Sequence, residues 1–189
     1  INKVETIRLF YADATDKDLR HASFNGKKWS FEVVDGNGER VNDYKDQIRV
    51  RTSSDVTSSS ACSYSATGLQ VFYRDDSQGI LLGATLLKNK WNYELVDGDR
   101  DTDNRTTGDV GFHISAQTIG KTVYLTYDSV LQVNQDKRAL RGEVRQATRS
   151  TIYPEDWSYS TLQSAANGVS VAGFAVSSAL LKNKLTSSW

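Results

Sequence analysis

Aromatic side chains recur along this chain in a pattern suited to carbohydrate recognition. A sugar ring is held by a flat aromatic face, which meets its C–H side, and by planar polar groups, which meet its hydroxyls. The side chains that fit these roles, and that we predict to bind such a ligand, are Arg8, Tyr11, His21, Trp29, Tyr73, Trp91, Tyr127 and Trp157. The alternative is that the evenly spaced rings are the packing residues of a repeated fold.

A second pattern suits a metal ion. Carboxylates occupy alternate positions in one polar loop, and such a density of hard oxygen ligands favours calcium. The predicted ligands are Asp97, Asp99, Asp101 and Asp103. The loop has Thr102 and Gly108 where an EF-hand needs Gly and Glu. A metal-free, solvated loop is therefore the alternative, and no cofactor other than calcium is expected.

Little in the chain indicates catalysis. His21 and His113 are the only histidines, and neither lies in a known nucleophile motif. The single cysteine, Cys62, excludes an intrachain disulfide and a cysteine zinc site, and its strand-like surroundings predict a small buried hydrophobe. Glycosidases such as sialidases combine arginines, a tyrosine and carboxylates that come from several units of a repeated fold. The chain has such residues but lacks the Ser-x-Asp-x-Gly-x-x-Trp box of sialidases. We expect no catalytic residue, and the alternative is a fragment of a secreted glycosidase or adhesin.

The elements that must position these side chains belong to an ungapped repeat. Residues 6–36 return at 68–98, displaced by 62 positions, with matching Phe-Tyr, Lys-Trp and Asp-Gly pairs. Alternating polar and apolar residues predict strands over 6–11, 19–24 and 29–34, and again over 69–73, 80–86 and 91–96. Three strands in sequence, joined by short polar turns, predict an antiparallel meander.

A further strand precedes each later set. Residues 51–56 match residues 105–110 at an offset of 54, and small apolar runs follow both. Four strands per unit indicate the blade of a β-propeller. We predict one all-β domain of four-stranded antiparallel blades, with units at about 5–50, 51–104 and 105–163 and a closing strand and tail at 164–189. The difference between the two offsets is an eight-residue insertion between 36 and 51, a candidate contact loop.

About three blades are too few for a ring. The run at 168–177 has the composition of a first strand and could complete the first blade, which would hide an open edge. The tail repeats the string "LLKNK" of 86–90, which favours the start of another unit over an irregular closing segment. We expect oligomerisation or further sequence to complete the ring.

The unit "IRLFYADATDKDLRHASFNGKKW" resembles the repeats of the fungal and bacterial fucose-binding propeller lectins. The resemblance covers about 30 residues in each of two units and, more loosely, the third. It implies blades that bind sugar between neighbours, and small members of the group build six blades from short subunits. The family's fucose-holding arginine falls on Arg8, Gln70 and Tyr124 in the three units, and its glutamate falls on His21, Gly83 and Gln146.

Composition restricts the partners. The 189 residues carry no net charge, so no overall field draws the chain to nucleic acid or to an acidic membrane surface. No apolar run is long enough to span a bilayer. The absence of methionine, even at position 1, and the sequon at Asn104 favour a secreted protein. We predict an extracellular, non-catalytic, lectin-like protein that binds glycans or glycoproteins as a homo-oligomer. A protein-interaction propeller is the alternative.

Overall fold

The computed structural model describes residues 6–36, 55–98, 105–106, 109–133, 139–151, 156–164, 176–181 and 184–188. Every regular element in these residues is a β-strand, and the strands pair antiparallel. No membrane-spanning helix is found in this part of the chain. The predicted all-β class is confirmed for the described residues.

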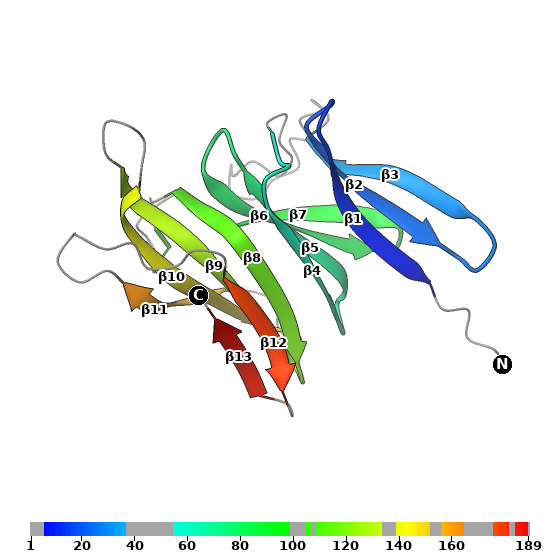
Figure 1. Ribbon diagram of the computed structural model, residues 1–189. Helices are drawn as coiled ribbons and strands as arrows, with labels where there is room; N and C mark the ends of the chain where they lie inside the picture. The colour runs from blue at the N-terminus through cyan, green and yellow to red at the C-terminus, as the bar shows by residue number, and fades with distance from the viewer. Residues whose placement is uncertain are drawn as a thin grey trace.

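Consecutive strands build consecutive sheets (Figure 1). The first sheet has the order β1 (Ile7–Asp13), β2 (Asp18–Phe24) and β3 (Trp29–Asp35). The second has β4 (Ser60–Ser65), β5 (Gly68–Asp75), β6 (Ile80–Leu87) and β7 (Lys90–Asp97). The third has β8 (Asp109–Ile119), β9 (Thr122–Val133), β10 (Ala139–Ser150) and β11 (Ser158–Ser164). A fourth, two-stranded sheet has β12 (Ser177–Leu181) and β13 (Lys184–Ser188).

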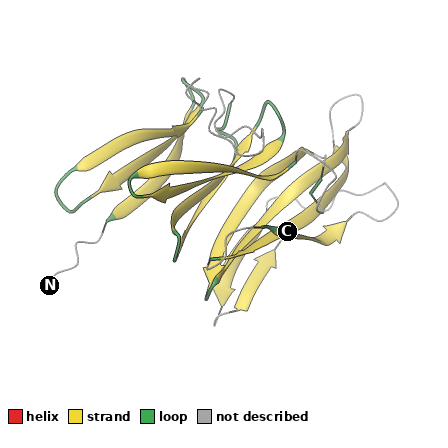
Figure 2. Ribbon diagram, turned by 180° about the vertical axis from the view of Figure 1, so that it is seen from behind, coloured by secondary structure: helices red, strands yellow, loops and turns green. Residues whose placement is uncertain are grey.

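The three larger sheets stand side by side, as Figure 2 shows from behind. One hydrophobic cluster joins the first sheet to the second and includes Leu19, Val34, Val71 and Leu82. Another joins the second to the third and includes Phe72, Val96, Leu125 and Ala147. The predicted antiparallel meanders of four strands are confirmed in the second and third sheets. The arrangement fits a β-propeller-like fold, and no closed ring forms among the described residues.

The repeated Asp-Gly pair ends the outer strand of the first and second sheets. Gly36 and Gly98 have φ angles of +95° and +105°, which side-chain-bearing residues rarely adopt. A Cβ atom on Gly36 would also lie 2.8 Å from Asp18 Cα. The preceding aspartates accept a hydrogen bond from these glycine N–H groups. The pair therefore recurs because the chain turns tightly where one sheet passes to the next.

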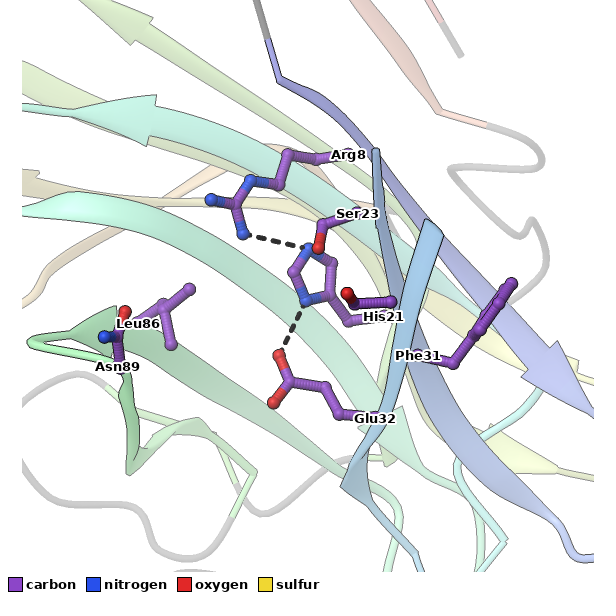
Figure 3. Close-up of a pocket in the computed structure, with 8 residues that line it drawn as sticks. Arg8, His21, Ser23, Phe31, Glu32, Leu86 and Asn89 are labelled. Atoms are coloured by element: carbon purple, nitrogen blue, oxygen red, sulfur yellow. Dashed lines mark hydrogen bonds and ion pairs between the residues drawn. The ribbon is translucent and has the colours of Figure 1, made fainter. Parts of the chain in front are cut away.

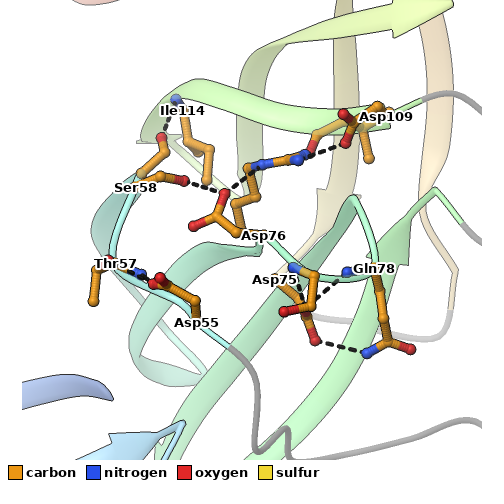
Figure 4. A network of polar contacts seen from close by, with 12 residues as sticks. Asp55, Thr57, Ser58, Asp75, Asp76, Gln78, Asp109 and Ile114 are labelled. Carbon is orange, nitrogen blue, oxygen red and sulfur yellow. Dashed lines mark hydrogen bonds and ion pairs between the residues drawn. The ribbon is translucent and has the colours of Figure 1, made fainter. Parts of the chain in front are cut away.

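A polar network fastens the third sheet to the turn between β5 and β6 (Figure 4). Arg74 donates to Asp76 at 2.8 Å, pairs with Asp109 at 2.5 Å and donates to the carbonyl of Val110. Gly79 accepts a backbone hydrogen bond from Val110. An equivalent bond joins Val56 to the carbonyl of the first sheet's turn, so the repeat preserves the contact between sheets as well as the strands.

Two predicted features concern ring closure. The first sheet has three strands, as expected, but most of the predicted closing run at 168–177 lies outside the described residues. The β12–β13 hairpin packs beside β8, where the Ser178 N–H donates to Ser115 Oγ. Among the described strands, β1 remains at the edge of its sheet. The candidate contact loop at 37–51 also lies outside the described residues.

The expected burial of Cys62 is wrong, because this residue is exposed. Cys62 pairs across the ladder with Val71, so it points toward the first sheet. The three described strands of that sheet cover Val71 but leave β4 open, and Tyr64 on the same face is 75% exposed.

Candidate functional site

A cavity of about 290 Å³ lies at the first junction, where the first and second sheets meet (Figure 3). Its lining combines charged, hydroxyl, amide and apolar groups. The lining residues are Arg8, His21, Ser23, Ser30, Phe31, Glu32, Leu86 and Asn89. Two of them, Arg8 and His21, belong to the residues predicted from the sequence.

Strand register brings the polar lining onto one face of the first sheet. His21 on β2 pairs with Glu32 on β3, and Ser23 pairs with Arg8 on one side and Ser30 on the other. Since directly paired residues in an antiparallel ladder share a face, these five side chains point toward the second sheet. Phe31 falls between Ser30 and Glu32, and its ring points away from the other labelled side chains in Figure 3.

Arg8, His21 and Glu32 form a hydrogen-bonded row. Arg8 Nη1 lies 3.4 Å from His21 Nε2, and His21 Nδ1 lies 2.8 Å from Glu32 Oε1. A guanidinium only donates and an ionised carboxylate only accepts. A neutral imidazole with its proton on Nδ1 satisfies both partners, because it accepts from Arg8 and donates to Glu32. The row thus orients a cation and a carboxylate toward the same cavity.

Aromatic packing holds the central histidine in place. The His21 side chain is almost fully buried, stacks on Phe10 at 5.0 Å and meets the edge of Trp91 at 5.6 Å. Phe10 comes from the first sheet and Trp91 from the second, so the imidazole is clamped at the junction. Glu32 is 48% exposed, and among the described residues its one hydrogen bond, to His21, uses Oε1 and leaves Oε2 unbonded. That oxygen is available to a ligand.

The second sheet supplies the opposite wall. Leu86 is the last residue but one of β6, and Asn89 lies in the turn before β7; both lie across the cavity from Arg8 and Glu32 (Figure 3). Asn89 has a φ angle of 62°, in the left-handed region that asparagine tolerates better than most residues. The turn thus places an amide opposite a carboxylate, with an apolar side chain beside it.

The other predicted aromatic residues lie in different environments. Tyr73 and Tyr127 are fully buried, and their hydroxyls donate to aspartates of the preceding sheet. They belong to the core rather than to a ligand surface, because a neighbouring sheet covers them. Tyr11 and Trp29 are 39% and 41% exposed on the outer face of the first sheet, away from the cavity. Trp157 lies at the next junction, against Phe72.

Asp97, predicted as a calcium ligand, is fully buried and bonded to protein groups. Its Oδ1 accepts from the N–H groups of Gly98 and Thr106, both at 2.8 Å. Its Oδ2 accepts from the Tyr127 hydroxyl at 2.6 Å and from Arg145 Nε at 3.0 Å. No group of three metal-ligating side chains occurs in the described part of the chain. The other predicted ligands lie outside that part, namely Asp99, Asp101 and Asp103.

Sequence reasoning missed several lining residues, of which Glu32 matters most. Its signal was present in the repeat, because Glu32 recurs as Glu94 on a strand that carries few other charges. Ser30, Leu86 and Asn89 had no such signal. Ser30 is brought near Arg8 by strand pairing within the first sheet, whereas Leu86 and Asn89 become neighbours of Arg8 only through the packing of two sheets.

No protein-family model matches the chain, and no curated protein matches its sequence. Among solved structures, the chain is similar to a fucose lectin from Kordia zhangzhouensis in complex with methyl-fucoside. The TM-score is 0.44 at 9% identity, over 85% of this chain and 92% of that chain. So distant a likeness does not define a ligand for this chain.

Proposed function

We propose that this chain is a non-catalytic, lectin-like protein that binds a carbohydrate in the cavity of the first junction. The observation that carries the proposal is the row Arg8–His21–Glu32, which presents to one cavity a guanidinium donor and a carboxylate oxygen that no described residue hydrogen-bonds. Neighbouring hydroxyls of a sugar act as both donors and acceptors, so one can accept from Arg8 while another donates to Glu32.

The size and charge of the cavity support a small neutral ligand. Its volume is about 290 Å³, at the lower end of the roughly 300–1,000 Å³ typical of small-molecule sites. The opposite charges of Arg8 and Glu32 offset each other, so neither an anion nor a cation is favoured overall. Leu86 supplies an apolar patch for the C–H groups of a sugar ring.

The cavity also supports binding rather than glycoside hydrolysis. Hydrolysis generally needs two carboxyl groups on opposite sides of the scissile bond. Glu32 is the one carboxylate among the residues that line the cavity. We propose an extracellular setting as well, since the sequon at Asn104 favours a secreted protein.

Binding can be tested by saturation-transfer NMR with a panel of methyl glycosides, followed by titration of those that respond. We expect Glu32→Gln and Arg8→Gln each to weaken binding about tenfold or more, as loss of a hydrogen bond to a charged group implies. Lys121→Gln, which removes an exposed charge from a distant turn, is the matched control and should bind normally. No response from any glycoside, or equal binding by Glu32→Gln, would contradict the proposal.

We also propose that a second copy of the chain covers the outer face of the first sheet. This face exposes Ile7, Leu9, Tyr11, Trp29 and Phe31. The equivalent residues of the second sheet are Leu69, Val71, Tyr73, Trp91 and Tyr93, and the first sheet packs over that face. The correspondence of the two faces in the repeat supports the proposal that a sheet of the same kind covers the outer face of the first sheet. Light scattering should show an oligomer that Leu9→Lys dissociates, whereas a monomer at all concentrations would exclude it.

A further inference from the structure

The second junction, between the second and third sheets, repeats the framework of the first. Phe72 meets the edge of Trp157 at 5.7 Å and 83°, as Phe10 meets Trp91 at 5.9 Å and 74°. Glu94 occupies the position of Glu32, 62 residues later in the sequence. Each of the two junctions therefore has a glutamate and a Phe-Trp pair at equivalent positions between neighbouring sheets.

A guanidinium group of the chain itself fills the second junction. Arg149 Nη1 and Nη2 donate to the two carboxylate oxygens of Glu94, at 2.5 and 2.9 Å. The Arg149 Cζ atom lies 4.2 Å from the centre of the Trp157 ring, and the Trp157 indole N–H also donates to Glu94. The Arg149 side chain is 7% exposed, so a bidentate ion pair and a cation–π contact hold it where solvent barely reaches.

Arg149 stands where the first junction has Leu86. In the second sheet, Leu86 on β6 pairs across the ladder with Trp91. In the third sheet, Ala147 pairs with Tyr159, as Ala84 pairs with Tyr93. The strands are antiparallel, so the residue two positions further along the first strand of each pair lies opposite the residue two positions back along the second. In the third sheet this places Arg149 opposite Trp157, and in the second sheet it places Leu86 opposite Trp91. The same position thus carries a short apolar side chain at one junction and a long cationic one at the other.

The opposite wall is adapted to the guanidinium. Gly83 of the second sheet replaces His21 of the first. A Cβ atom on Gly83 would lie 3.2 Å from Glu94 Cγ, from Glu94 Oε1 and from Phe72 Cδ1. The missing side chain leaves room for Glu94 to lie across β6 and reach Arg149. At the first junction His21 fills this room and binds Glu32 instead.

From these contacts we propose that the second junction is a guanidinium-binding site occupied by the chain's own Arg149, and that the residue at position 86 or 149 decides whether a junction is open. The first junction is open because Leu86 is too short to reach Glu32. The part of this inference that concerns sugars rests on the proposed function, whereas the guanidinium part does not.

Chemical rescue tests the guanidinium part. Arg149→Ala removes the side chain beyond Cβ, and ethylguanidinium supplies the missing atoms. We expect ethylguanidinium to raise the melting temperature of Arg149→Ala toward that of the wild type and to change tryptophan fluorescence in a saturable way. Neutral ethylurea should do neither. The wild type, whose site is filled, should show no saturable response, and Glu94→Gln in the Arg149→Ala background should abolish it. A folded Arg149→Ala that responds like the wild type would overturn the proposal.

The reciprocal variant Leu86→Arg keeps the test decisive if Arg149→Ala does not fold. Its new guanidinium should pair with Glu32 and give additional slowly exchanging arginine N–H signals in nitrogen-15 NMR spectra, which Glu32→Gln removes. Absence of these signals in a folded Leu86→Arg would also overturn the proposal. If the wild type binds a methyl glycoside, Leu86→Arg should bind that glycoside about tenfold or more weakly. The new guanidinium would take the place of the glycoside's contact with the charged group of Glu32. If no glycoside binds, the proposed function fails and the rescue experiment still decides the second junction.

Discussion

Tyr73 of the second sheet donates its hydroxyl hydrogen bond to Asp35 of the first sheet at 2.6 Å, and both side chains are fully buried. Tyr127 and Asp97 repeat this contact between the third and second sheets at the same distance. Each aspartate is the last residue of an outer strand and also binds the following glycine. The pair therefore couples the end of one sheet to the centre of the next.

Loss of this contact should weaken the interface between sheets. We expect Tyr73→Phe to lower the free energy of unfolding by about 2 kcal/mol, because it leaves a buried carboxylate without one of its donors. Tyr64→Phe is the control, since Tyr64 is largely exposed, and it should change stability by less than about 0.5 kcal/mol. Urea unfolding of both variants measures the difference, and equal midpoints would refute the assigned role.

Stability should fall in alkaline solution as Tyr127, in the equivalent pair between the second and third sheets, loses its proton. Burial, together with the Asp97 carboxylate, raises the pKa of the Tyr127 hydroxyl well above its ordinary value of about 10. The folded state therefore holds this proton after the unfolded state has released it. The stabilisation is complete below about pH 10 and is lost as pH rises through the folded-state pKa. Melting temperatures from pH 8 to 11 should decline less steeply for Tyr127→Phe, and identical slopes would count against the shift.

The histidine of the first junction should matter for binding more than for folding. His21→Phe keeps a ring between Phe10 and Trp91 but cannot accept from Arg8 or donate to Glu32. We expect glycoside binding to fall about tenfold or more when the row is broken. Stability should change by less than about 1 kcal/mol, as for other volume-conserving replacements. Paired titration and melting measurements separate the effects, and unchanged binding would show that His21 does not orient the site.

The repeated tryptophans should differ in their contribution to stability. Trp91 packs against the cluster between the first and second sheets, whereas Trp29 is 41% exposed. We expect Trp91→Ala to cost about 3 kcal/mol and Trp29→Ala less than about 1 kcal/mol, since the cost of truncation follows the buried contact that is lost. Chemical denaturation tests this order. Equal losses would mean that Trp29 is also covered, as the proposed second copy would cause.

Cys62 reports on the open face beside β1. The thiol is exposed, so a disulfide reagent should modify it without unfolding the chain. Although Cys62 is accessible to a reagent, the protein atoms around its side chain displace part of the water and raise the pKa of the thiol by desolvation, so modification should be slow near neutral pH and accelerate in alkaline solution as the thiolate forms. Modification only after denaturation, in a sample that light scattering shows to be monomeric, would contradict the exposed position of Cys62.

The local pattern of the sequence determined the strands, their turns and the unit of repetition. Strand alternation and Asp-Gly turns depend on residues a few positions apart, so the strands over 29–35 and 90–97 were predictable from the chain alone. The match between residues 6–36 and 68–98 also predicted that the two sheets would be alike. It did not predict which copies of a repeated residue would be buried.

The tertiary structure determines which copies of a repeated residue are buried. Tyr11 and Tyr73 occupy the same position in the repeat, yet Tyr11 is 39% exposed and Tyr73 is fully buried, because a sheet packs over one and not over the other. Glu32 binds His21 and lines the cavity of the first junction, whereas Glu94 binds Arg149 through both of its carboxylate oxygens. Burial and pairing depend on side chains from the next sheet, about 60 residues away in sequence, and such contacts leave no periodic trace in the chain that makes them.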